Sequence, residues 1–148
     1  MITRYAETED LPTVYLLAWQ GYKELKEIAP EKVDPDLLWQ WILKAHSQAP
    51  QVILEKDGEI IGLWGLCTIK AAWSHDVMLA DYMFYILPKH RSFKATKQLK
   101  EAVCSVADKF KLTLRLSYLF KSKAPVHARI FAMMGFSTSG FIGFYKRT

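Results

Sequence analysis

A run of basic side chains stands directly before a predicted helix, and its residue types could bind an anion. The segment reads Leu87-Pro88-Lys89-His90-Arg91-Ser92-Phe93-Lys94-Ala95-Thr96-Lys97. Free backbone N–H groups and the helix dipole favour negative charge at a helix N-terminus. Cations at that end oppose the dipole, which costs stability unless a negative group binds there. The segment therefore predicts a phosphate or pyrophosphate site; the alternative is a solvated, exposed helix end.

The elements that must position this segment follow from periodicity and turn signals. Asp34-Pro35 is typical of a helix start, and Asp57-Gly58 between two β-rich runs predicts a type I′ hairpin. Gly62 and Gly65 in the second run indicate a bulge or a close backbone approach. Strands are expected over 2–6, 52–55, 60–69, 77–87, 113–120 and 141–146, and helices over 11–22, 35–45, 95–110 and 125–134. This order predicts an α+β or mixed α/β sheet with helices on both faces.

Composition fits one domain over residues 1–148. The 17.1 kDa chain is 51% hydrophobic and 24% charged, which is near the globular average. Cys67 and Cys104 lie in apolar stretches without a Cys or His cluster, so neither a disulfide scaffold nor a metal site is expected. The formal net charge of +5 favours an anionic partner. Because no export signal and no apolar run of the ~20 residues of a membrane helix is present, we expect a cytoplasmic location and no membrane partner.

Four motifs along the chain resemble those of the GCN5-related N-acetyltransferase (GNAT) family. The opening Arg4-Tyr5-Ala6-Glu7-Thr8-Glu9-Asp10 is similar to the family's Arg-x-Ala-x-x-x-Asp, and Asp57-Gly58 with Ile60-Ile61-Gly62 is similar to its hairpin. FYILPKHRSFKATKQL (84–99) resembles its strand, Pro-x-x-Arg turn and acetyl-CoA loop. ARIFAMMGFSTSGFIGFYK (128–146) resembles its closing helix, Gly-Phe pair and last strands. The implied fold is the GNAT-like acyl-CoA N-acyltransferase fold, a mostly antiparallel sheet of six to seven strands with helices on both faces.

The resemblance implies acetyl-CoA as the acetyl donor, lying against the strand that ends near Ile86, with its pyrophosphate on the loop and helix start. Arg91 matches the family's motif-opening Arg or Gln. Two positions at which the family has glycine or a small residue carry Lys94 and Thr96 instead. The residues expected to bind the cofactor are Tyr85, Ile86, Leu87, Arg91, Ser92, Phe93, Lys94, Ala95, Thr96 and Lys97.

The reaction implied by the resemblance is direct attack of a primary amine, on a small molecule or a protein, upon the thioester. Asp81, expected to open the strand before the loop, is the candidate base, and strand alternation places it on one face with Met83 and Tyr85. Asp76 is an alternative, and for both carboxylates a solvated strand-end aspartate is the competing interpretation. Phe131 stands at the position where many members of the family have a tyrosine that acts as the general acid. Tyr118, Tyr145, His127 or water are the remaining candidate acids.

Acceptor recognition is expected from the first two helices and their connection. The aromatic side chains there either line a substrate cleft or belong to the hydrophobic core. They are Trp19, Tyr22, Trp39 and Trp41, with Trp73 further along the chain. The acidic residues Glu24, Glu27, Glu31 and Asp36 favour an amine or a lysine-bearing acceptor.

Two other functions compete with an active acetyltransferase. Phe131 and the filled glycine positions also fit a catalytically weak member of the fold that binds CoA or a partner protein. The basic charge and the aromatic residues fit a nucleic-acid binder, but no helix-turn-helix, RNA-recognition or zinc pattern supports it. A homodimer through edge strands and Phe141, Phe144 and Tyr145 stays open.

Overall fold

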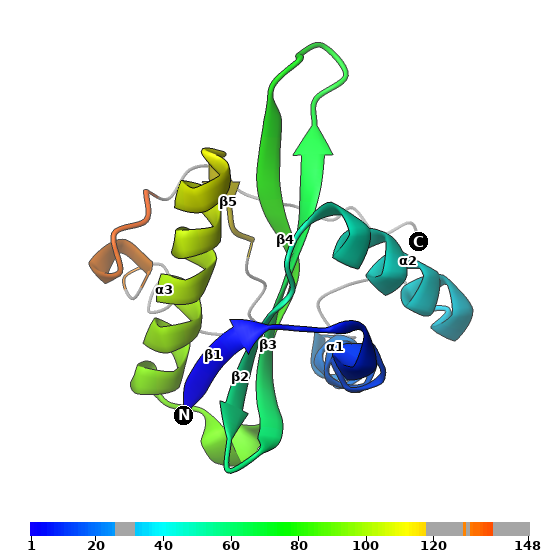
Figure 1. Ribbon diagram of the computed structural model, residues 1–148, viewed down its shortest axis with the longest axis vertical. Coiled ribbons are helices and arrows are strands. Elements are labelled where there is room, and N and C mark those ends of the chain that lie inside the picture. The colour runs from blue at the N-terminus through cyan, green and yellow to red at the C-terminus, as the bar shows by residue number, and fades with distance from the viewer. Residues whose placement is uncertain (26–31, 118–128, 130, 138–148) are drawn as a thin grey trace, which may run out of the picture.

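The fold is a five-stranded sheet with helices on both of its faces (Figure 1). The computed structural model describes residues 1–25, 32–117, 129 and 131–137. Its strands are β1 (Ile2–Tyr5), β2 (Val52–Lys56), β3 (Glu59–Lys70), β4 (Val77–Ile86) and β5 (Leu114–Arg115). Its helices are α1 (Leu11–Leu25), α2 (Pro35–Gln48) and α3 (Phe93–Phe110), with 3₁₀ turns at Thr8–Asp10 and Pro88–His90.

The sheet is mixed, and its strands lie in chain order from β1 to β5. The first four pair antiparallel, whereas β4 and β5 pair parallel through Leu79↔Leu114 and Ala80↔Arg115. The mixed α/β class and the mostly antiparallel sheet are confirmed. The described residues hold five strands, fewer than the six to seven expected. The predicted strand 141–146 and half of the predicted helix 125–134 lie outside the described residues, and of 113–120 the structure pairs Leu114–Arg115.

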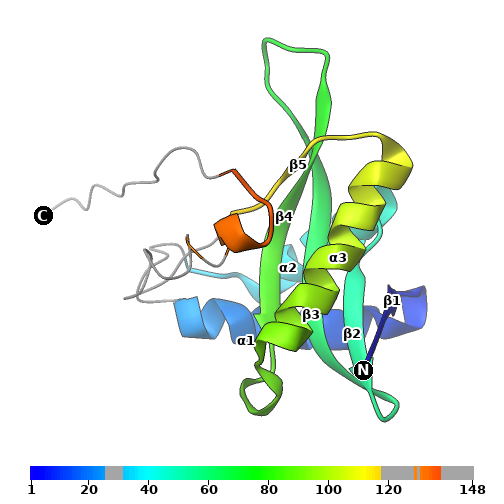
Figure 2. The same cartoon turned by 90° about the vertical axis from the view of Figure 1, so that its left-hand side faces the viewer.

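Two hydrophobic clusters separate the faces of the sheet. Figures 1 and 2 show α1 and α2 on one side of the strands and α3 on the other. The cluster under α3 includes Trp64, Ile86 and Leu99, and the cluster under α1 and α2 includes Leu63 and Met83. The face on which a β4 side chain lies can therefore be read from the cluster that it joins.

Local sequence signals account for the helix start and the hairpin. The Asp34 side chain accepts hydrogen bonds from the amides of Asp36 (2.9 Å) and Leu37 (3.0 Å), which caps α2 at the predicted position. Asp57 and Gly58 have φ values of 52° and 79°, which the predicted type I′ turn requires. The β2–β3 hairpin is confirmed, with a register shift beside Gly62.

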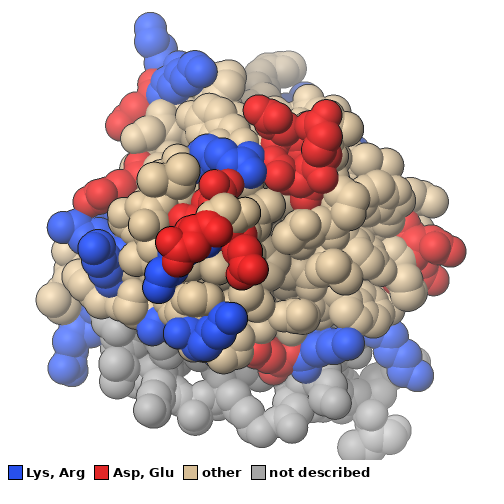
Figure 3. All heavy atoms as spheres, turned by 60° about the horizontal axis from the view of Figure 1, so that its bottom comes forward, with Lys and Arg blue, Asp and Glu red and all other residues tan. Residues whose placement is uncertain are grey.

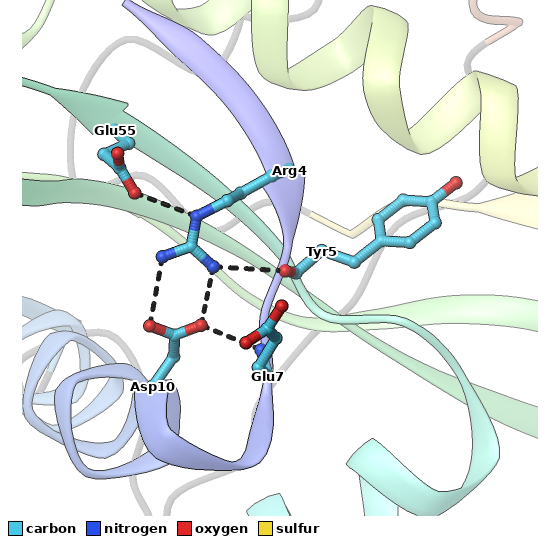
Figure 4. A network of polar contacts seen from close by, with 5 residues as sticks. All are labelled: Arg4, Tyr5, Glu7, Asp10 and Glu55. Atoms are coloured by element: carbon cyan, nitrogen blue, oxygen red, sulfur yellow. Dashed lines mark hydrogen bonds and ion pairs between the residues drawn. The ribbon is translucent and has the colours of Figure 1, made fainter. Parts of the chain in front are cut away.

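The opening motif is a clamp that joins β1, β2 and the start of α1 (Figure 4). The Arg4 guanidinium contacts both Asp10 carboxylate oxygens, at 2.6 and 3.1 Å, and donates from Nε to Glu55 at 2.8 Å. Asp10 also accepts the Glu7 amide at 2.8 Å. The hydrogen bonds from Arg4 hold the pKa of Asp10 below its ordinary value. The motif is therefore structural in this chain.

Candidate cofactor-binding site

The end of β4 leads through a 3₁₀ turn into α3, and this junction is the predicted anion site. Ser92 caps α3, because its hydroxyl accepts the Ala95 amide at 3.0 Å. The helix begins at Phe93, two residues before the predicted start. Helix geometry leaves the first amides, those of Phe93 and Lys94, without an intrahelical acceptor. Two backbone donors and the positive end of the helix dipole therefore lie ahead of α3.

Thr96 occupies one of the positions that carry a small residue in the family. Its hydroxyl donates to the Ser92 carbonyl at 3.1 Å, so the side chain bonds to its own helical turn. Lys94, at the other such position, is exposed. The Thr96 hydrogen bond therefore leaves the Phe93 and Lys94 amides of the first turn free.

Arg91 is held by two elements. Its Nε donates to the Ile86 carbonyl at 2.8 Å, and its Nη2 lies 2.9 and 2.7 Å from the two carboxylate oxygens of Glu24 at the end of α1. Its guanidinium carbon is 5.2 Å from the centre of the Tyr85 ring. Among the described residues, no hydrogen bond uses Nη1 of Arg91, so these two N–H donors are available to a ligand.

Glu24 links Arg91 to Tyr85. The Tyr85 hydroxyl donates to Glu24 at 2.9 Å and lies 3.5 Å from the Gln20 side-chain oxygen. Burial, and next the contact with Glu24, raise the pKa of Tyr85. Sequence reasoning assigned Glu24 only to general acidity near the acceptor; the pairing with Arg91 spans 67 residues and has no local signal.

The other predicted cofactor residues divide into buried and exposed side chains. Ile86 and Ala95 belong to the core cluster under α3, and Leu87 packs at the edge of both clusters. Ser92, Phe93, Lys94 and Lys97 are exposed. The junction therefore offers backbone and exposed polar groups to a ligand, while the aliphatic side chains anchor it to the core.

The lysines near the start of α3 are not a uniform positive patch. Lys97 lies 3.8 Å from Glu101, and the Lys100 ammonium is 5.8 Å from the centre of the Phe136 ring. Figure 3 shows basic and acidic side chains side by side on the face that lies at the bottom of Figure 1. Such an arrangement does not favour broad phosphate-backbone binding, which needs clustered basic residues.

Asp81 is in the middle of β4, not at its start, and lies on the face of α3. One carboxylate oxygen accepts the Ser117 amide at 2.7 Å, and the other accepts the Trp64 indole N–H at 3.0 Å. Burial raises the pKa of Asp81 to about 6, against the opposing effect of these hydrogen bonds. Asp81 therefore ties β4 to the chain just after β5.

The predicted grouping of Asp81 with Met83 and Tyr85 is wrong, because β4 contains a bulge. Gly65 pairs with Met83 but its neighbour Leu66 pairs with Asp81, so Tyr82 is an extra residue in β4. Met83 and Tyr85 consequently lie in the cluster under α1 and α2. Gly65 was correctly predicted as a place of irregularity.

The remaining candidate catalytic residues are only partly described. Tyr118, Tyr145 and His127 lie outside the described residues. Asp76 is exposed in the β3–β4 loop, and its amide donates to the Ser74 hydroxyl at 3.0 Å. Phe131 is buried in the α3-side cluster, with its ring centre 6.5 Å from that of Trp64. The position at which the family has a tyrosine therefore holds a core side chain.

The predicted acceptor aromatics do not form a single wall. Trp19 and Trp39 both contact Tyr15, with ring centres 6.4 and 5.9 Å apart, between α1 and α2. Trp41 packs edge-on against Tyr82 at 6.1 Å. Trp73 is 90% exposed in the loop of the β3–β4 hairpin, which projects beyond the helices (Figure 1).

A hollow among the described residues lies away from the junction. It measures about 340 Å³, is open to solvent, and lies between β1 and α3, away from the first turn of α3. Its lining residues are Thr3, Arg4, Tyr5, Val52, Ala102 and Ser105. Because it is far along α3 from the free amides, it is not the predicted anion site.

In the described part of the chain, no helix combines the length and the apolar composition of a membrane span.

Comparison with solved structures identifies the fold. A predicted acetyltransferase from Clostridium acetobutylicum, solved with acetyl-CoA, superposes with a TM-score of 0.74 at 14% identity, covering 97% of this chain and 94% of that one. A GNAT family acetyltransferase from Staphylococcus aureus gives 0.63 at 18% identity, covering 99% and 98%. A ribosomal-protein-alanine N-acetyltransferase from Brucella melitensis biovar Abortus gives 0.69 at 13% identity, covering 100% of both chains.

These likenesses define a mixed α/β fold of the acetyltransferase type. More particularly, the chain has the GNAT fold. No protein-family model matches the chain, and no curated protein matches it in sequence.

Proposed function

We propose that the chain is a divergent single-domain GNAT enzyme that transfers an acetyl group from acetyl-CoA to a primary amine of a small molecule or a protein. The observation that carries the proposal is the β4–α3 junction. There a capped helix start offers two free amides, and Arg91, two residues before the helix, keeps Nη1 unused by its bonds to Ile86 and Glu24. Free amides, the helix dipole and a guanidinium are the groups that bind a diphosphate. The same fold is solved with acetyl-CoA in the Clostridium acetobutylicum protein.

The residues present fit this cofactor without the family's glycines. The Thr96 hydroxyl is turned back to its own helix, and the exposed Lys94 adds a cation at the helix start. We assign phosphate contacts to Arg91, Lys94 and the first α3 amides, with Ser92, Phe93, Ala95, Thr96 and Lys97 shaping the turn. Tyr85, Ile86 and Leu87 would border the remainder of the cofactor along β4.

Acetyl-CoA, when bound, supplies the acetyl group as a thioester, so that a C–N bond to the acceptor forms as the C–S bond breaks. The chain must accept the proton that the amine loses and return one to the departing sulfur. Asp81, whose pKa of about 6 leaves it mostly ionised at neutral pH, is the proposed base. Tyr118 and Tyr145 are the proposed acids.

Arg91→Ala tests the proposal directly. Titration calorimetry should show acetyl-CoA binding weakened by about tenfold, because one charge-assisted contact to phosphate is lost. Lys89→Ala, which removes an exposed cation from the same turn, is the matched control and should bind as the wild type does. Equal affinities for the wild type and Arg91→Ala would remove the junction from cofactor binding.

The burial of Phe131 favours a second function, a CoA-binding protein without turnover. Its test is the wild-type protein with acetyl-CoA and a broad panel of amines. Thermal stabilisation by acetyl-CoA together with no release of free thiol would favour this second function. Thiol release with any amine would favour the transferase.

A further inference from the structure

The extra residue in β4 is fixed through its side chain. The Tyr82 ring covers Gly65 so closely that a Cβ atom there would lie 2.6 Å from ring atom Cε1. The Tyr82 hydroxyl donates to Gln51 Oε1 at 2.6 Å. Glycine is thus required at position 65 by the ring, and the ring is held at its far end by Gln51.

Gln51 is the one described polar residue that is fully buried, and its hydrogen bonds fix its orientation. Its Nε2 donates to two backbone carbonyls, that of Ala49 at 3.0 Å and that of Leu66 at 2.7 Å. Both amide protons are therefore used, and Oε1 must be the acceptor for Tyr82. The side chain links the segment before β2 to β3 and to the extra residue of β4.

A third element holds the backbone of the bulge. The Tyr22 hydroxyl, from α1, donates to the Tyr82 carbonyl at 3.3 Å. The bulged residue is thus contacted at its ring by β3, at its hydroxyl by Gln51 and at its carbonyl by α1. Because three elements contact the bulged residue, the sequence specifies this bulge through side chains. An irregularity formed by the strand backbone alone would need none of these contacts.

The bulge decides which face each later β4 side chain occupies. Because side chains alternate, one extra residue exchanges the faces of all that follow it. With the bulge, Tyr85 reaches Glu24 on the α1 side and Ile86 enters the cluster under α3. The β4–β5 ladder also ends just before it, at Ala80↔Arg115. The bulge therefore starts the stretch of β4 that the proposed function places along the cofactor.

We propose that Gln51 and Tyr82 are positioning residues for acetyl transfer. By fixing the bulge they fix the direction of the β4 backbone from Met83 to Ile86, along which the proposed function places the cofactor. Neither side chain touches the reacting atoms. This inference rests on the proposed function. It adds Tyr82 in β4 and Gln51 outside β4 as residues on which the rate of acetyl transfer should depend.

Tyr82→Phe is the test, since it keeps the ring on Gly65 and removes only the hydroxyl. We expect kcat for thiol release to fall about tenfold or more, because small displacements of a reacting group are costly. The calorimetric Kd for CoA should stay within about twofold, because the diphosphate site at α3 is unaltered. Tyr15→Phe is the matched control: the same atom is lost from a half-buried ring in the aromatic group between α1 and α2.

The double variant Gln51→Met/Tyr82→Phe completes the test. It removes both side-chain partners of the Tyr82–Gln51 hydrogen bond, but it also takes the donor from the Ala49 and Leu66 carbonyls, so the thermal midpoint of each variant, including Gln51→Met alone, is measured first. If both residues act through one hydrogen bond, its kcat should equal that of the poorer single variant and not the product of two losses. A kcat within about twofold of the wild type for the folded variants overturns the inference. A wild-type protein that neither binds CoA nor releases thiol overturns the proposed function instead.

Discussion

Replacing Asp81 by asparagine should change how the stability of the protein depends on pH. Burial raises the pKa of this carboxyl from 3.8 to about 6, so between about pH 4 and pH 6 the folded state keeps a proton that the unfolded state has lost. The free energy of unfolding therefore falls as the pH rises through this window. A rise of this size corresponds to about 3 kcal/mol between the two ends. Asparagine cannot ionise, so the variant lacks this contribution.

The assay is urea unfolding of the wild type and of Asp81→Asn at several pH values from about 4 to about 7. The difference between the two unfolding free energies cancels the other carboxyl groups. As the pH rises across the range, the wild type should lose about 3 kcal/mol of unfolding free energy relative to Asp81→Asn. Asp76→Asn, an exposed carboxylate near the start of β4, controls for the loss of one charge. A difference that stays constant across the range would refute the buried setting of Asp81.

Gly65, Asp10 and Arg91 are tested by one substitution each, with Gly21→Ala as a comparison for the first. Gly65→Ala should cost about 1–3 kcal/mol in a denaturant titration, because the new methyl group meets the Tyr82 ring. Gly21→Ala should cost less, because its close contact is with the flexible end of Met83, the Tyr85 ring is at ordinary contact distance, and alanine improves helix propensity. Asp10→Asn should lower the unfolding free energy by about 1 kcal/mol near neutral pH, an effect that should fade in acid as the wild-type Asp10 is itself protonated. Arg91→Ala should shift the thermal midpoint little, because its exposed pair with Glu24 contributes about 1 kcal/mol or less. A large loss of stability in Arg91→Ala would mean that its affinity change reports unfolding.

Local signals in the sequence predicted the elements well. The Asp34-Pro35 helix start and the Asp57-Gly58 hairpin turn are properties of two adjacent residues, so no tertiary information is needed to find them. The start of α3 was placed two residues late, because Ser92 and not a later residue caps it. Strand existence was readable from β-rich runs, although β5 is far shorter in the described residues than its run.

Side-chain environments were less predictable, since they depend on residues distant in the sequence. Alternation placed Asp81 with Tyr85, but the extra residue between them reverses the face; Gly65 signalled an irregularity without showing which strand would carry it. The partner of Arg91 lies on a helix 67 positions earlier. The helix start at the β4–α3 junction was readable because helix geometry is local, whereas anion binding there stays a prediction.

The strand order of the sheet has a consequence for how the protein acquires its structure. β2, β3 and β4 are consecutive in the chain and are joined by hairpin connections, so their pairing closes only short loops. β1 joins β2 only after the whole of α1 and α2 has been spanned, and β5 joins β4 only after α3. We expect β2, β3 and β4 to assemble first and β1 and β5 to dock later, so that β1 and β5 should be the slower of the described strands to pair.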